Sequence, residues 1–199
     1  MTRTTVLAAA AALLLGTAIP AQSASATIRL VGTLRATAQG FALDEHPQPL
    51  VPAGIDLLPF VGHVAELTGA MRTDGSAVDI ATAQLATERF QASGNTGIGN
   101  DVQFRIDVPG VARWYLYAAL GGAMVPLESY MPYGSGTLWL DPGSLVSLLA
   151  GDIDRTWQGR LTVPRDPALI GMTVYFQGAV HMPPGPLKFL NSAHLTVMP

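Results

Sequence analysis

Short runs of alternating apolar and polar residues, each bounded by glycine or proline, recur along most of this sequence. In Val102–Val108 the apolar side chains occupy every second position, and similar alternation runs through residues 27–38 and 172–180. A period of two puts neighbouring side chains on opposite faces of an extended chain, which is typical of half-buried antiparallel strands. With 21 glycines and 15 prolines dividing these runs, the sequence predicts an all-β protein with very little helix.

Two of these runs flank a Pro-Gly pair at 109–110, which suggests a hairpin. A loop of odd length pairs Ile106 with Trp114 and keeps the apolar side chains on one face, whereas a two-residue loop mixes the faces. Type II turns, which Pro-Gly favours, also fit a tight two-residue hairpin poorly. We therefore predict a hairpin with an odd loop. The alternative is that the two runs belong to different sheets.

A stretch of leucines gives the clearest helical spacing in the chain. In Ser144–Ala150, leucines at i, i+3 and i+4 predict a helix of at most two turns. Asp141 or Ser144 is the candidate N-cap, and Gly151 is the candidate end. Residues 76–91 favour neither structure, because alanine and glutamine suit a helix while the apolar residues alternate as in a strand.

The N-terminus has the features of a signal peptide. Arg3 precedes the apolar run Val6–Leu15, and Ala24–Ala26 fits the small-residue cleavage motif. A membrane anchor, the alternative, needs about 20 apolar residues, and Pro20 interrupts the run too early. The sequence predicts a mature chain that begins at Thr27 and is secreted or periplasmic. Because there is no cysteine, it is not a lipoprotein.

The charge of the chain and its lack of cysteine limit which partners it can bind and how its fold is stabilised. Removal of residues 1–26 takes away Arg3 and leaves 10 basic against 14 acidic residues, a net charge of 10 − 14 = −4. Without a run of basic residues to neutralise phosphates, we expect neither a nucleic-acid partner nor an anionic membrane surface. An exported chain without cysteine has no disulfide, so stability must come from burial of its 49% hydrophobic residues.

One segment carries a resemblance to a known fold. Residues 49–71, PLVPAGIDLLPFVGHVAELTGAM, read as an apolar strand, a short segment ending in glycine, and a strand of the rough pattern V-x-V-x-G. Gly62 and Gly69 occupy the glycine positions, and between them fall Val64, Glu66 and Thr68. This resembles small exported bacterial barrels of the oligonucleotide/oligosaccharide-binding (OB) type. The resemblance implies an OB-like barrel over residues 27–89 and a strand within 77–87.

The C-terminal half carries a second resemblance. Segments 104–120, 136–142 and 164–167 resemble a β-sandwich module of uncharacterised exported bacterial proteins, to which no reaction is attached. The other positions that carry it are Leu169, Gly171, Tyr175, Gln177, Asn191 and Ser192. Together the two resemblances imply three parts: a signal peptide (1–26), an OB-like barrel (27–89) and an antiparallel β-sandwich (90–199).

The proline corner at 164–167 is interpreted as a turn and not as a catalytic loop. Its prolines end a strand, Asp166 is placed to cap a short turn, and Gly171 permits the reversal into the next strand. Gln177 is predicted to be a structural clamp that holds the proline-rich connection 182–188 by hydrogen bonds, since an unsatisfied buried amide is costly.

Metal ligands are few and widely spaced. The histidines at 46, 63, 181 and 194 lack the spacing of zinc sites. His181 and His194 are the pair most able to share a metal, but surface positions at strand edges explain them better. Asp152 and Asp154 resemble the start of a calcium loop that lacks its remaining ligands. We expect no metal and no cofactor, with these two aspartates as the weak candidates.

Catalytic motifs are equally scarce. Ser135, flanked directly by glycines, only superficially resembles the nucleophile motif G-x-S-x-G. Glu66, Glu88 and Glu128 lie in separate segments, and no local feature pairs them as glycosidase carboxylates. We predict no catalytic residue from the sequence.

Aromatic residues near glycine and proline turns are the remaining binding candidates, because exposed rings at loop ends stack on sugars or peptides. They are Tyr130, Tyr133, Trp139 and Trp157. For Trp139 we favour the alternative, burial beneath the turn at Ser144.

We expect an exported, non-enzymatic β protein with a binding, scaffolding or surface-associated role, its partner a protein or a carbohydrate. The alternative is a secreted hydrolase or carbohydrate-active enzyme built from dispersed carboxylates. A pocket that holds two facing carboxylates, or a histidine with a serine, would favour the enzyme.

Overall fold

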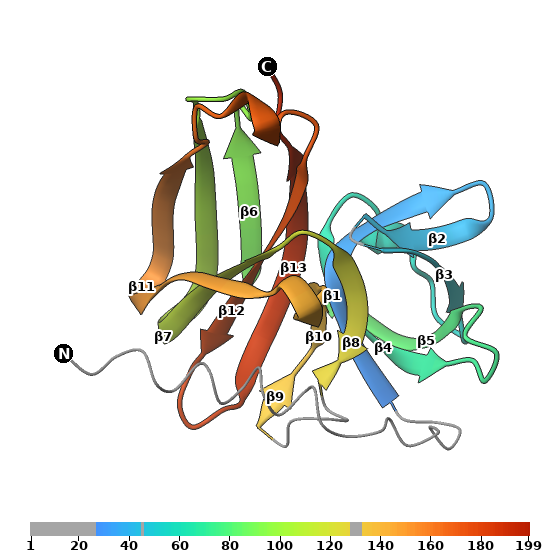
Figure 1. The fold of residues 1–199 in the computed structure, drawn as a ribbon. Helices are drawn as coiled ribbons and strands as arrows, with labels where there is room; N and C mark the ends of the chain where they lie inside the picture. The colour runs from blue at the N-terminus through green and yellow to red at the C-terminus, as the bar shows by residue number, and fades with distance from the viewer. Residues whose placement is uncertain (1–26, 45, 128–132) are drawn as a thin grey trace.

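A computed structural model of the chain describes residues 27–44, 46–127 and 133–199, and these residues form an all-β protein (Figure 1). Short 3-10 turns occur at η1 (Leu58–Phe60), η3 (Pro142–Ser144) and η4 (Pro167–Leu169). The strands are β1 (Thr27–Thr37), β2 (Gly40–Leu43), β3 (His46–Pro52), β4 (Val64–Met71), β5 (Val78–Leu85), β6 (Arg89–Gly94), β7 (Asp101–Ala119), β8 (Gly122–Pro126), β9 (Gly134–Ser135), β10 (Thr137–Leu140), β11 (Val146–Thr162), β12 (Thr173–His181) and β13 (Leu187–Thr196).

The N-terminal strands close into a barrel in the order β1-β2-β3-β5-β4. β3 and β5 run parallel, and the other neighbouring strands are antiparallel. This confirms the predicted OB-like barrel. Gly69 lies where a Cβ atom would come within 2.2 Å of the Asp79 carbonyl oxygen, so only glycine lets β4 and β5 approach this closely. Gly62, with a φ of +82°, turns the chain into β4.

The second sheet is built around β7, which is a single long strand. Its first half pairs with β6 and its second half with β12 along the same edge, while β11 pairs along the other edge. The predicted hairpin at 109–110 is therefore wrong. Apolar and polar side chains keep alternating in phase through the Pro-Gly pair. A bent strand therefore fits the pattern as well as a hairpin with an odd loop does. The bend is matched on β11 by a bulge at Arg155, whose φ is +75°.

The helix predicted at Ser144–Ala150 is also wrong. Asp141 does cap a turn, since its carboxylate accepts hydrogen bonds from Gly143 N and Ser144 Oγ, but that turn is only η3. From Val146 onward the chain pairs with β7, because the sheet ladder outweighs a short run of helical spacing. The sequence pattern of residues 76–91 does not decide between a helix and a strand, and in the structure these residues form β5 and the start of β6.

The bend curls the second sheet into two facing layers, as a sandwich requires (Figure 1). One layer contains β6 with the first half of β7, and the other contains β12, β13 and the second half of β7. Phe90 from the first layer packs with Phe176 and Leu190 from the second. The buried Asn191 amide joins the layers: its Oδ1 accepts from Phe90 N at 2.9 Å, and its Nδ2 donates to Phe90 O at 2.7 Å.

A two-stranded ribbon, β8 with β10, lies between the curled sheet and the barrel. Trp139 of β10 is 2% exposed and packs into the barrel core, where its indole N–H donates to Val31 O at 3.0 Å. Thr137 Oγ1 donates to Arg29 O at 2.7 Å. Trp139 is thus buried, as the favoured alternative expects, but within the barrel and not beneath the turn at Ser144.

Gln177 clamps this ribbon to the sheet. Its side chain is fully buried, with Oε1 accepting from Trp139 N at 2.9 Å and Nε2 donating to the carbonyls of Thr137 at 2.8 Å and Leu190 at 2.7 Å. The structural role predicted for Gln177 is correct, but the predicted partner, residues 182–188, is wrong. The Gln177 face of β12 is covered by β10, whose backbone groups satisfy the amide.

The predicted signal peptide and its cleavage site lie outside the described residues and stay predictions. Within the described ranges, no helix has the length and hydropathy needed to cross a bilayer.

Candidate functional site

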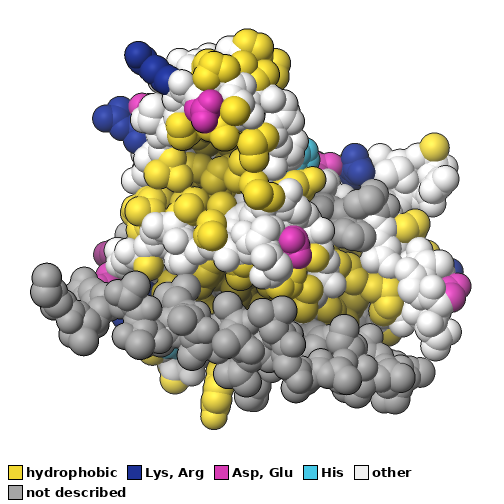
Figure 2. Space-filling model, viewed as in Figure 1, with side chains coloured by type: hydrophobic (Ala, Val, Ile, Leu, Met, Phe, Trp, Pro, Cys, Tyr) yellow, Lys and Arg dark blue, Asp and Glu magenta, His cyan; other side chains and the backbone are white. Residues whose placement is uncertain are grey.

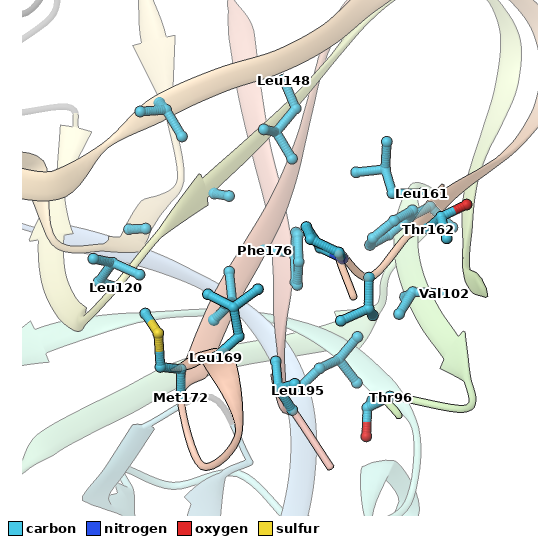
Figure 3. A pocket seen from close by; sticks show the side chains of 18 of the residues that line it. Thr96, Val102, Leu120, Leu148, Leu161, Thr162, Leu169, Met172, Phe176 and Leu195 are labelled. Carbon is cyan, nitrogen blue, oxygen red and sulfur yellow. The ribbon is translucent and has the colours of Figure 1, made fainter. Parts of the chain in front are cut away.

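An apolar cleft of about 460 Å³ opens between the two layers of the curled sheet (Figure 3). Leu120, Leu169 and Met172 lie on one side of it in this view, and Val102 and Leu161 on the other. Phe104 and Phe176 also line it, with their ring centroids 4.9 Å apart. The cleft therefore lies directly on the aromatic core of the sandwich.

The polar side chains in the lining carry only hydroxyl groups. They belong to Thr96, Ser144 and Thr162, while the remaining lining residues are aliphatic, aromatic, proline or methionine. The lining contains no carboxylate, imidazole or basic group within the part of the chain that the structure describes. Such a surface is suited to bury hydrocarbon, because apolar burial is non-directional. It offers no group for acid–base chemistry.

Apolar side chains continue from the cleft onto its mouth. Leu120 is 60% exposed and Val146 is 52% exposed, and Leu148 and Met172 are also exposed. Figure 2 shows hydrophobic side chains gathered in a hollow over the curled sheet, and all four of these residues line the cleft. Isolated exposed apolar residues are common, but a contiguous group beside a cavity marks a contact site.

The proline corner forms one wall of this cleft. Asp166 Oδ1 accepts from Ala168 N at 2.9 Å and so starts η4, as predicted, and Gly171, with a φ of +85°, reverses the chain. Backbone hydrogen bonds fix the corner at both ends: Val163 N donates to Asn100 O, and Gly171 N donates to Val197 O. The corner is a turn, as interpreted from the sequence, and its apolar side chains also line the cleft.

Of the four predicted aromatic candidates, the three that the structure describes do not come together at a site. Tyr130 lies outside the described residues, and Trp139 is buried in the barrel. Tyr133 is 81% exposed beside the start of β9, whereas Trp157 stacks on Trp114 with ring centroids 3.9 Å apart. None of the described aromatic candidates lines the cleft. A ligand role for Tyr133 or Trp157 stays a prediction.

The weak metal candidates are also dispersed. Asp152 and Asp154 are exposed on β11, and within the described ranges no three histidine or acidic residues gather as a metal site would require. His194 lies opposite Tyr175, while His181 lies near the other end of the β12–β13 pair, opposite Leu187.

The fold does bring together Glu66 and Glu88, which the sequence left in separate segments. Lys188 forms ion pairs with both carboxylates, and Arg29 binds Glu66 through Nε at 2.6 Å and Nη2 at 2.5 Å. Glu128, the third acid considered, lies outside the described residues. All four side chains are mostly buried where β13 meets the barrel. Two positive charges match two negative charges in this cluster.

Glu66 in this cluster is poised to stay ionised. Burial acts to raise its pKa, but the hydrogen bond and charge of Arg29, with the charge of Lys188, outweigh burial and hold the pKa below its usual value. A glycosidase acid needs the opposite shift, a raised pKa that keeps a proton at neutral pH. Glu66 therefore lacks the shift of a general acid, and the ion pairs of the cluster join the barrel to the sheet.

Comparison of the sequence with protein-family models and with curated proteins found no match. The size of the cleft, its hydrocarbon lining and its apolar mouth are the features of a binding site for an apolar molecule.

Proposed function

We propose that this protein binds an apolar ligand, or the apolar part of a larger one, in the cleft of the curled sheet. The single observation that carries the proposal is the open apolar cleft of about 460 Å³ on an ordered core. An open cleft of this size exposes apolar lining to water, and covering that surface with an apolar ligand is favourable. Binding would transfer both the ligand surface and the exposed mouth out of water.

The size of the cleft sets the class of ligand. Its volume of about 460 Å³ is roughly three times the 150 Å³ that hold a benzene molecule in an engineered cavity. An alkyl chain or a small fused ring system fits this space. Each 100 Å² of apolar surface that the ligand and the wall bury contributes about 2.5 kcal/mol before the cost of association.

The setting of this activity rests on the N-terminal sequence. With the expected signal peptide, and with the resemblance to exported bacterial two-domain proteins, we place the binding protein in the periplasm or outside the cell. Its role there is non-enzymatic. The hydrolase alternative gains no support from a lining of hydrocarbon and hydroxyl groups.

The proposal is tested with an uncharged fluorescent probe, N-phenyl-1-naphthylamine, titrated into the exported protein. We expect saturable binding. Val174→Trp places an indole in the cleft and should weaken binding at least about tenfold, or about 1.4 kcal/mol.

Val111→Trp is the matched control, because Val111 is 74% exposed and does not line the cleft. This variant should bind like wild type. Absence of saturable binding, or equal loss in both variants with unchanged circular dichroism, would contradict the proposal.

A further inference from the structure

The outward face of the layer formed by β6, β7 and β11 is polar throughout. Across it, Arg89 lies opposite Asp107, which in turn lies opposite Thr156. In the next row, Arg105 stands between two glutamines of the neighbouring strands. The fold thus places arginines from different segments on one surface, although the sequence contains no basic run.

Asp107 is the centre of this surface. Its carboxylate accepts from Arg105 Nε at 2.9 Å and from Thr156 Oγ1 at 2.9 Å. Arg89 Nε lies 3.6 Å away, which is beyond hydrogen-bond distance. Asp107 therefore orients the two guanidinium groups without using all of their donors, since each guanidinium carries five N–H groups.

A second cavity, of about 370 Å³, lies over this row, between the sheet and the end of the barrel that contains His63. Its lining includes Arg89, Arg105 and Arg155 together with Asp107. Three guanidinium groups against one carboxylate leave an excess of two positive charges, in a chain whose net charge is −3. No lining residue is shared with the apolar cleft.

Arg155 supplies the second, independent observation. It sits at the bulge of β11 with a φ of +75°, a conformation that is unfavourable for a long side chain. Within the described part of the chain it has neither an ion pair nor a hydrogen bond from its guanidinium. The Arg155 side chain is exposed and lines the cavity, so its N–H donors are available to a bound anion.

We propose that this cavity binds a phosphate or sulfate group. Arginine recognises tetrahedral oxyanions through paired N–H donors, and the hydroxyl of Thr156 adds a further polar group at the same place. The site is independent of the apolar cleft, and the two can be occupied together.

The test is isothermal titration calorimetry of the exported protein with inorganic phosphate and with sulfate, at constant ionic strength set by chloride. We expect saturable binding in the wild type. Arg155→Asn should weaken it about tenfold, because a charge-assisted hydrogen bond is lost, while asparagine tolerates positive φ. Arg89→Gln should weaken binding similarly.

Arg160→Gln is the control, since Arg160 lies on the same face two rows away, 77% exposed and beside Asp101. It should leave phosphate binding unchanged, and every variant should keep the wild-type circular dichroism spectrum as evidence of folding. The proposal is overturned if the wild type shows no saturable binding. It is also overturned if Arg160→Gln weakens binding as much as Arg155→Asn, because the attraction would then be diffuse.

Discussion

At the scale of single residues, buried polar side chains join the parts of this molecule. Gln177 satisfies three backbone groups on two strands, and Asn191 satisfies both backbone groups of Phe90 across the two layers. Such residues are identifiable from sequence as polar positions in apolar strands, and the structural role of Gln177 is predicted in that way. Their hydrogen-bond partners are not identifiable from sequence, because those partners belong to strands far away in the chain.

Gln177→Met keeps the side-chain volume but removes the hydrogen bonds. It removes the hydrogen bond from Trp139 N and those to two carbonyl oxygens, and each buried group that loses such a bond costs about 1–3 kcal/mol. We expect the free energy of unfolding in urea to fall by at least about 2 kcal/mol. Gln158→Met, on the exposed face of β11, serves as the control and should change stability little. Equal effects in the two variants would refute the clamp.

Glu66 makes stability depend on pH in the acid range. Its pKa in the folded protein lies below the usual 4.5, so its contribution is present above that value and is lost as pH falls through the folded pKa. Glu66→Gln should therefore flatten the decline of unfolding free energy below about pH 4.5. Asp152→Asn, at an exposed position, should leave the slope as in wild type. A Glu66→Gln slope equal to that of the control would show that the ion pair contributes nothing.

At the scale of elements, the alternating pattern predicts which side chains face inward and leaves the connections open. The even-numbered residues of Val102–Val108 are buried, as expected, and so is Trp114 beyond the bend. Both a hairpin and a bent strand keep that phase, so pattern alone cannot separate them. The helix predicted over Ser144–Ala150 is wrong for a related reason. From Val146 onward this segment pairs with the edge of β7, and local spacing does not show a contact with a strand so distant in sequence.

Gly110→Ala separates the two interpretations of the Pro-Gly pair. In the bent strand Gly110 does not have positive φ, and a Cβ there meets nothing within 4 Å. The substitution should leave stability unchanged or raise it by up to about 1 kcal/mol. Gly171→Ala, at a φ of +85°, should lower stability by about 1–2 kcal/mol. Similar losses at both glycines would favour the type II turn.

At the scale of the whole molecule, the barrel and the curled sheet share a core through the ribbon. Trp139 fills the barrel from a strand that follows it by some fifty residues, and its indole bonds to β1. We expect residues 27–88 alone not to fold, because loss of a buried tryptophan costs about 3–5 kcal/mol, most of the stability of a small domain. A fragment that melts cooperatively at the temperature of the intact chain would contradict this.

The barrel was predictable from sequence, whereas neither proposed binding site was. Leu169, Val174 and Leu195 read as ordinary core residues, because alternation shows which face is apolar but not whether another layer fills it. The arginines of the second cavity come from three strands and are isolated in the sequence. Both sites are products of the bend in β7.

The central claim, that the apolar cleft is a binding site, is tested most directly by methyl NMR during titration with N-phenyl-1-naphthylamine. The structure predicts saturable shifts at Leu148, Val174 and Leu195, which line the cleft, and none at Leu30 and Leu67 in the barrel core. Shifts confined to the barrel, or no saturable shift at the cleft, would contradict it.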